Sequence, residues 1–218
     1  YTVELKDGEQ IRIRGSIDRV DTYETAGKKY VRVVDYKTYD KDFVAEKVKY
    51  GLDTQLLHYI YAYCEKNGTI PAGVFYYGVT LPNVNITGRE TPDEIMKEIA
   101  KTVKRSGILI DDIEIVRAMS NDFSTVPAKL SKGSKKEAPK LYTRGKSKRL
   151  YTEEDFDNLK KSLGDGLKSI ASNVFCGRMD IAPLDPEDIK AEPCKYCKLG
   201  DLCRNKKTET EEIDDDED

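Results

Sequence analysis

Asp35 and Lys37 stand two residues apart in the stretch VRVVDYKTY, residues 31–39, which has the apolar composition of a buried strand. Residues two apart on a strand point to the same face, so both charges share one face while Tyr36 points to the other. A charge on a buried face is costly unless it has a partner or a function. Two interpretations are open: a solvated ion pair at a strand edge, or a site where Asp holds a metal ion and Lys stabilises a phosphate during phosphodiester hydrolysis.

A second carboxylate for such a site is available in GSIDRVD, residues 15–21. A hairpin closing over residues 22–29 would bring Asp18 beside Asp35. Two neighbouring carboxylates repel each other unless a cation or a shared proton lies between them, so the pairing predicts a divalent metal ion. The backbone carbonyl of Tyr36 could face the same ion.

Gln55 and Tyr59 add a polar pair one helical turn apart, shortly after the strand that carries Lys37. Side chains at i and i+4 lie on one face of a helix. The pair could orient a phosphate or a base edge, or it could simply mark the boundary between the polar and apolar faces of the helix. The residues alone leave both interpretations open.

The elements that would position these residues follow from periodicity and turn signals. Alternating apolar residues through Ile11, Ile13 and Ile17 and the strand at 30–37 predict a β-meander. Helical spacing predicts a helix over 51–66 that ends at Asn67-Gly68, and a further strand is expected over 72–80.

Three more helices are indicated downstream. Thr91, Pro92 and Glu94 form a capping box, a shorter helix is expected over 112–119, and a long one is expected to open at Thr152 and Asp155 and to stop near Gly177. Strands that alternate with helices in this order predict an α/β fold with a mixed sheet packed by helices.

Three of the five cysteines, Cys194, Cys197 and Cys203, fall within ten residues in the pattern C-x₂-C-x₅-C. Thiolates at this spacing bind zinc or an iron–sulfur cluster, and spacing alone does not distinguish the two. Three reduced structural thiols are the third possibility. The odd total argues against a disulfide framework.

Charge is distributed unevenly along the chain, whose net charge is −3. Residues 208–218 carry eight acidic groups and no basic one, which leaves 37 basic against 32 acidic groups before them. Between 125 and 150 lies a basic segment, which is either a polyanion-binding surface or a solvated loop. No apolar run reaches the roughly 18 residues of a membrane helix, and the first residues lack a signal-peptide layout, so a soluble cytoplasmic protein is expected.

Taken in order, GSIDRVD, VVDYKT and YGLDTQLLHYIYAY resemble the motif series of the RecB-family nucleases in the PD-(D/E)xK superfamily. IDDIEIVRAM and PCKYCKLGDLC are similar to segments of the C-terminal nuclease domains of AddB-type subunits. The resemblance covers nearly the whole chain apart from the acidic tail. It implies a restriction-endonuclease-like mixed sheet flanked by helices, with a C-terminal cysteine cluster.

The resemblance also implies roles for individual residues. Asp18 and Asp35 correspond to the metal ligands for Mg²⁺ or Mn²⁺, together with the Tyr36 carbonyl. Lys37 corresponds to the catalytic lysine, and Gln55 with Tyr59 to the Q-x-x-x-Y motif. His58 matches no active-site position and is left out of the site.

Cys194, Cys197 and Cys203 correspond to three of four ligands of a 4Fe-4S cluster. Family members carry the fourth cysteine, and a histidine of the active site, in a region that would precede Tyr1. Residues 1–207 are therefore expected to be a nuclease domain without its N-terminal part, with the basic loop at 125–150, the cysteine cluster at 194–203 and a disordered tail at 208–218. An incomplete cluster and weak or absent activity are expected of such a chain.

The implied function is metal-dependent cleavage of DNA strands, exonucleolytic or endonucleolytic, leaving 5′-phosphate and 3′-hydroxyl ends. The strands would be fed by an AddA-like helicase subunit during double-strand break processing and recombinational repair in the bacterial cytoplasm. The alternative is a non-catalytic DNA-binding module with a structural Fe-S or zinc site.

Overall fold

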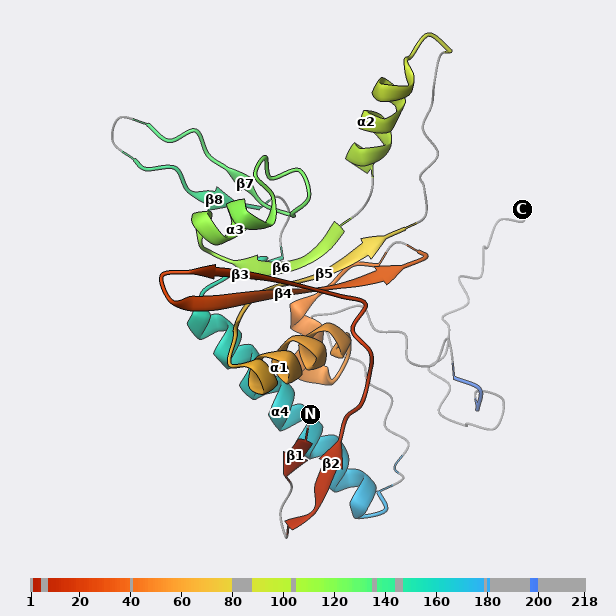
Figure 1. Ribbon diagram of the computed structural model, residues 1–218. Helices are drawn as coiled ribbons and strands as arrows, with labels where there is room; N and C mark the ends of the chain where they lie inside the picture. The colour runs from red at the N-terminus through yellow and green to blue at the C-terminus, as the bar shows by residue number, and fades with distance from the viewer. Residues whose placement is uncertain are drawn as a thin grey trace, which may run out of the picture. The chain divides into compact units, whose positions relative to one another are not determined.

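The structure, a computed structural model, describes residues 2–4, 8–39, 41–79, 88–102, 105–134, 137–143, 147–178, 180 and 197–199. The chain divides into two compact units, Tyr1–Ser172 and Asn173–Asp218. The first unit contains the sheet and the residues proposed above for chemistry at the strands (Figure 1).

A five-stranded mixed sheet is the centre of the first unit, in the order β3-β4-β5-β6-β9. β3 pairs antiparallel with β4, β4 parallel with β5, β5 antiparallel with β6, and β6 parallel with β9. The strands span Arg19–Thr25 (β3), Lys28–Lys37 (β4), Ile70–Gly78 (β5), Arg105–Ile110 (β6) and Leu150–Tyr151 (β9). Two antiparallel hairpins stand apart from this sheet: β1 (Thr2–Glu4) with β2 (Gln10–Arg12), and β7 (Lys129–Leu130) with β8 (Leu141–Tyr142).

Helices cover both faces of the sheet, which confirms the predicted mixed sheet flanked by helices. They are α1 (Gln55–Asn67), α2 (Pro92–Thr102), α3 (Ile113–Met119) and α4 (Glu153–Phe175), with a 3₁₀ helix, η2, at Ala45–Tyr50. Figure 1 shows α1 and α4 on one face and α3 on the other. α1 packs on β4 and β5, and Tyr61 of α1 donates a hydrogen bond to the carbonyl of Phe156 in α4.

β4 is buried because it has a neighbouring strand at each edge and helices over each face. Val31, Val33 and Val34 are at most 1% exposed and belong to the core. A strand covered on both faces is rich in apolar residues, and in this strand Arg32 is the one charged residue between Tyr30 and Asp35. α1 connects β4 to its parallel neighbour β5, so the end of β4 and the start of α1 lie close together.

The helix boundaries follow the capping signals closely. Thr91 and Glu94 exchange the two hydrogen bonds of a capping box at α2, and Thr152 and Asp155 do the same at α4. α1 begins at Gln55 and not at residue 51, because η2 precedes it and ends at Gly51 with φ of 74°. The left-handed backbone of Gly51 ends the first helical segment before the second can start.

The sequence did not predict β6 or the strands within the basic segment. β6, residues RSGILI, went unpredicted because six residues with Ser and Gly near the start give a weak strand signal. The basic segment 125–150 contributes β7, β8 and the start of β9, so it is more than a solvated loop.

The cysteine cluster and the tail fall mainly outside the described residues. Cys194, Cys203 and residues 208–218 are not among them, while Cys197 is described and exposed. No helix in the described part of the chain is both long enough and apolar enough to cross a membrane.

Candidate active site

Asp18 directly precedes β3, and Asp35 lies near the end of β4, which pairs with β3 in a hairpin. The hairpin turns through Ala26 and Gly27, whose φ angles of 49° and 74° suit a two-residue turn with left-handed central residues. This turn sets the register that pairs Thr25 with Lys28 and Arg19 with Val34. Asp18, the residue before Arg19, therefore lies beside the end of β4 that carries Asp35.

The side chain of Asp18 reaches the backbone of β4 and not the carboxylate opposite it. Its Oδ2 accepts a hydrogen bond from the backbone N–H of Tyr36 at 2.9 Å. The carboxylate of Asp18 is thereby held beside the peptide units that flank Asp35, and it remains exposed to solvent.

Asp35 is buried, with 4% of its surface exposed. Its Oδ2 lies 2.7 Å from Nζ of Lys37, and apart from this ion pair it has no hydrogen-bond partner within the described part of the chain. Burial lowers the pKa of Lys37, but the hydrogen bond and negative charge of Asp35 outweigh it, so that the pKa lies above its ordinary value. The lysine is therefore an ammonium ion at neutral pH.

A line of hydrogen bonds continues from Lys37 into α1. Lys37 Nζ donates to Oε1 of Gln55 at 3.2 Å, and Nε2 of Gln55 donates to the hydroxyl of Tyr59 at 3.0 Å. Gln55 and Tyr59 lie one turn apart on the helix, as their spacing predicts. The structure thus brings together all five side chains singled out in the sequence.

Gly15 also contributes to this arrangement, and no motif in the sequence indicates it. A Cβ at this position would lie 2.7 Å from Cε1 and 3.2 Å from the hydroxyl of Tyr59. The absence of a side chain lets the Tyr59 ring lie against the backbone of the segment that carries Asp18. Gly15 and Tyr59 are far apart in sequence, so the requirement for glycine at this position is seen only in the folded structure.

A second group of charges adjoins Lys37. Nζ of Lys41 lies 4.5 Å from the ring centroid of Tyr76 and 3.3 Å from Oδ1 of Asp53, while Nζ of Lys37 lies 5.4 Å from the same ring. Burial lowers the pKa of Lys41, but Tyr76 and Asp53 outweigh it and raise that pKa overall. Two cations therefore share the Tyr76 ring, although no short motif linked them.

The oxygen atoms here fit a hard divalent cation. Asp35 presents a buried carboxylate oxygen that is paired with an ammonium, and the carboxylate of Asp18 is bonded to the adjacent backbone N–H of Tyr36. Mg²⁺ and Mn²⁺ prefer such oxygen ligands. Within the described ranges no three His, Cys, Asp or Glu side chains gather as a metal-binding group, so an ion would rest on two carboxylates, a carbonyl and water.

His58 lies on α1 beside these residues and is half-buried. Burial lowers the pKa of its imidazole.

Comparison with known proteins follows this geometry. The chain matches the family described as the PD-(D/E)XK nuclease superfamily over residues 1–204. It is 34% identical over 209 residues to a protein of Thermoanaerobacter sp. (strain X514), the subunit designated B of an ATP-dependent helicase/deoxyribonuclease. The alignment covers 92% of this chain and 17% of that protein.

Further relatives carry the same description. The protein of Ruminiclostridium cellulolyticum is 34% identical over 212 residues, and that of Clostridium perfringens (strain 13 / Type A) is 32% identical over 214 residues. Each alignment covers 93% of this chain and 18% of the relative. The chain thus spans less than a fifth of the length of the relatives that it matches.

Proposed function

This chain belongs to the PD-(D/E)XK nuclease superfamily, and we propose that it is the metal-dependent deoxyribonuclease domain of an AddB-like helicase–nuclease subunit. The observation that carries the proposal is the continuous line of contacts from Asp35 through Lys37 and Gln55 to Tyr59, with the Asp18 carboxylate bonded to the backbone next to Asp35. In an ordinary exposed ion pair both side chains face solvent. Here the Asp35 carboxylate is buried, and the lysine that it pairs with is also hydrogen-bonded to a neighbouring helix.

Asp18, Asp35 and the backbone carbonyl of Tyr36 would hold Mg²⁺ or Mn²⁺. Such an ion, when bound, polarises a phosphate oxygen and lowers the pKa of bound water. Cleavage replaces the bond between phosphorus and the 3′-oxygen by a bond to the oxygen of water, leaving a 5′-phosphate and a 3′-hydroxyl.

Lys37 is the group of this chain that would stabilise negative charge on the reacting phosphate and orient the attacking water. Its ammonium is held from two sides, by Asp35 and by Gln55. Tyr59 acts as a positioning residue, because its hydroxyl fixes the amide of Gln55 and its ring is set by Gly15. Fixed placement of a charge in this way lowers the reorganisation that the reaction requires.

The test is degradation of end-labelled single-stranded and duplex DNA in Mg²⁺ or Mn²⁺. Asp35→Asn and Lys37→Ala should each abolish cleavage, and Asp111→Asn, which changes an exposed carboxylate away from the site, should not. Metal-dependent cleavage that persists in the Asp35→Asn protein would contradict these roles.

DNA that is bound without being cut, in any metal, would favour the alternative of a non-catalytic DNA-binding module. Metal analysis of the purified protein distinguishes an iron–sulfur site from a zinc site. We propose that Cys194, Cys197 and Cys203 supply three of the four ligands of a 4Fe-4S cluster, which predicts iron in a protein that also carries the fourth ligand; zinc without iron would indicate a zinc site instead.

The setting of the activity is proposed from the relatives alone. Their description joins a helicase to a deoxyribonuclease, so we propose that an AddA-like helicase subunit feeds single strands to this domain. Processing of double-strand breaks for recombinational repair, in the bacterial cytoplasm, is the corresponding role.

A further inference from the structure

Four side chains form a row on the sheet face opposite Asp35 and Lys37. Arg19, Tyr36, Tyr77 and Arg105 come from the neighbouring strands β3, β4, β5 and β6. Tyr36 is paired with Tyr77 in the β4–β5 register, and Tyr77 with Arg105 in the β5–β6 register. We call these four residues the Arg–Tyr row.

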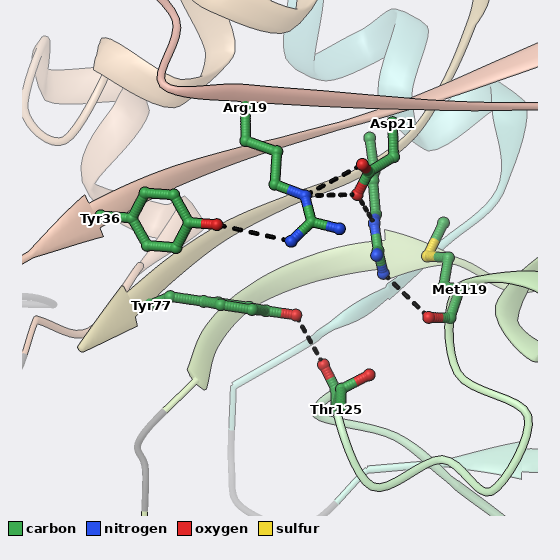
Figure 2. Close-up of polar contacts among 7 residues, drawn as sticks. Arg19, Asp21, Tyr36, Tyr77, Met119 and Thr125 are labelled. Carbon is green, nitrogen blue, oxygen red and sulfur yellow. Dashed lines mark hydrogen bonds and ion pairs between the residues drawn. The ribbon is translucent and has the colours of Figure 1, made fainter. Parts of the chain in front are cut away.

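Contacts between neighbours hold the row together. Nη1 of Arg19 donates to the hydroxyl of Tyr36 at 3.4 Å, and the rings of Tyr36 and Tyr77 meet edge to face with centroids 6.2 Å apart (Figure 2). Cζ of Arg105 lies 5.3 Å from the centroid of Tyr77. Guanidinium groups thus stand at both ends of a pair of aromatic rings.

Further bonds hold Arg19 and Tyr77 in place. Arg19 pairs with Asp21 at 3.0 Å, and Asp21 in turn pairs with Arg32 at 2.7 Å. The Tyr77 hydroxyl donates to the carbonyl of Thr125 at 2.9 Å, as Figure 2 shows. These side chains are therefore set in place before any ligand arrives.

The row is exposed to solvent at Tyr36 and Arg19, where a base could stack. Tyr36 is 40% exposed, and the side chain of Arg19 is 45% exposed. Tyr39 and Val79, just beyond the ends of β4 and β5, are 60% and 52% exposed. An exposed aromatic ring flanked by arginines is the composition of surfaces on which the bases of single-stranded nucleic acids stack.

A basic pocket continues the row beyond β6. It has a volume of about 270 Å³, and its charged lining comprises Arg105, Lys129 and Arg149 with one carboxylate, Asp42. Nε of Arg105 is buried there without a hydrogen-bond partner in the described residues, although Nη1 of the same side chain donates to the Ser124 carbonyl. Three cations against one anion make this pocket suited to a phosphate group.

The row lies at the same end of the sheet as the candidate active site. Arg19 directly follows Asp18, and Tyr36 lies between Asp35 and Lys37 but points to the other face. Three strand spacings of about 4.8 Å separate the two arginines, or roughly 14 Å along the sheet edge. Because the two sites lie on opposite faces, a DNA strand with one phosphate at Asp18 and Asp35 would pass around the end of β4 to contact the row.

We propose that the Arg–Tyr row and the basic pocket together bind single-stranded DNA, with a base stacked on Tyr36 and a backbone phosphate in the pocket of Arg105, Lys129 and Arg149. The proposal rests on the proposed function and assigns a surface of this chain to the binding of its single-stranded substrate. Duplex DNA would gain less from this surface, because its bases are already stacked on each other.

The test is the binding of fluorescein-labelled dT15 by fluorescence anisotropy in EDTA, where no cleavage occurs. Tyr36→Ala should weaken binding at least about fivefold, the effect of losing one stacked base, and Tyr36→Phe should retain it. Tyr23→Ala is the matched control, because Tyr23 lies on the same strand face as Arg19, at the far end of β3, and is 37% exposed.

The pocket is tested by the salt dependence of the same binding. Loss of one phosphate contact in Lys129→Gln should reduce the slope of log K against log salt by about 0.7. Arg117→Gln, at an exposed position on α3, should leave the slope unchanged. Circular dichroism of each variant establishes that the fold is retained.

Equal affinity of the Tyr36→Ala and Tyr23→Ala proteins for dT15 would overturn the proposal, as would an equal effect of Tyr36→Ala on a 15-base-pair duplex. Failure of the row and failure of the proposed function give different results. If the wild-type protein cleaves DNA and Tyr36→Ala does not change DNA binding, the proposal for the row is rejected and the nuclease function stands. If Tyr36→Ala weakens DNA binding but the wild-type protein cleaves no DNA, the nuclease function is rejected and the row stands.

Discussion

Removing the lysine of the Asp35–Lys37 pair should destabilise the metal-free protein far more than removing an exposed lysine. The side chain of Asp35 is 5% exposed and that of Lys37 is 19% exposed, so Lys37→Ala leaves a buried carboxylate without a counter-charge. Breaking a fully buried pair costs about 3–5 kcal/mol, and the partial exposure of Lys37 reduces this to about 2–4 kcal/mol. For a chain of this length that is a fall in melting temperature of roughly 4–16 °C.

The measurement is thermal and urea unfolding followed by circular dichroism in EDTA. Lys160→Ala is the control, since Lys160 and Glu65 form an ion pair with side chains 38% and 50% exposed. An exposed pair of this kind contributes less than about 1 kcal/mol. Asp35→Asn should cost less than Lys37→Ala, because Lys37 can be hydrated when its partner becomes neutral.

Mn²⁺ gives the same experiment a second readout. A ligand at about 100 times its dissociation constant stabilises the folded state by about 2.7 kcal/mol. The gain from Mn²⁺ should be larger in Lys37→Ala than in wild type, since the ion supplies the missing positive charge, and it should vanish in Asp35→Asn. Similar stability of Lys37→Ala and Lys160→Ala in EDTA, or undiminished stabilisation of Asp35→Asn by Mn²⁺, would refute this reasoning.

Three further outcomes are expected. Gly15→Ala should reduce the cleavage rate about 10- to 100-fold by displacing the ring of Tyr59. The double variant Gly15→Ala/Tyr59→Ala should cleave only slightly more slowly than Tyr59→Ala, and a double-mutant cycle on cleavage rates measures this. Ala26→Asn should raise the free energy of unfolding by about 0.5–1 kcal/mol without changing cleavage, because asparagine tolerates the φ of 49° better than alanine; urea unfolding measures it. His58 has a pKa below its unfolded value of about 6.5, so the stability from keeping it neutral is complete above that pH and is lost as the pH falls below it. Urea unfolding at several pH values should therefore show a smaller loss on acidification for His58→Gln than for wild type, and equal losses would contradict the assignment.

Local signals in the sequence were sufficient for the helix ends and for the grouping of charges on β4. The capping residues Thr91 and Thr152 marked the starts of α2 and α4, because a cap is an interaction between residues three apart. The i, i+2 spacing of Asp35 and Lys37 placed both on one face of β4, and the Lys37–Asp35 and Lys37–Gln55 contacts bear this out.

Contacts between distant segments were not accessible in the same way. The approach of Gly15 to Tyr59, and the sharing of the Tyr76 ring by Lys37 and Lys41, depend on how β4, β5 and α1 pack. β6 was missed because its position is stabilised by pairing with β5 and by burial of its apolar residues, and its own six residues carry little strand preference.

The turn at Ala26 and Gly27 links the two faces of the sheet to one register. A two-residue turn pairs Thr25 with Lys28, and the same register then brings Asp18 to the backbone N–H of Tyr36 and Arg19 to the hydroxyl of Tyr36. A slip of one residue would reverse the faces of β3, moving the Arg19 guanidinium to the Asp35 side of the sheet. The carboxylates of the candidate metal site and the guanidinium of the Arg–Tyr row are therefore positioned by the same two-residue turn. A change in that turn should alter both contacts of a substrate strand together.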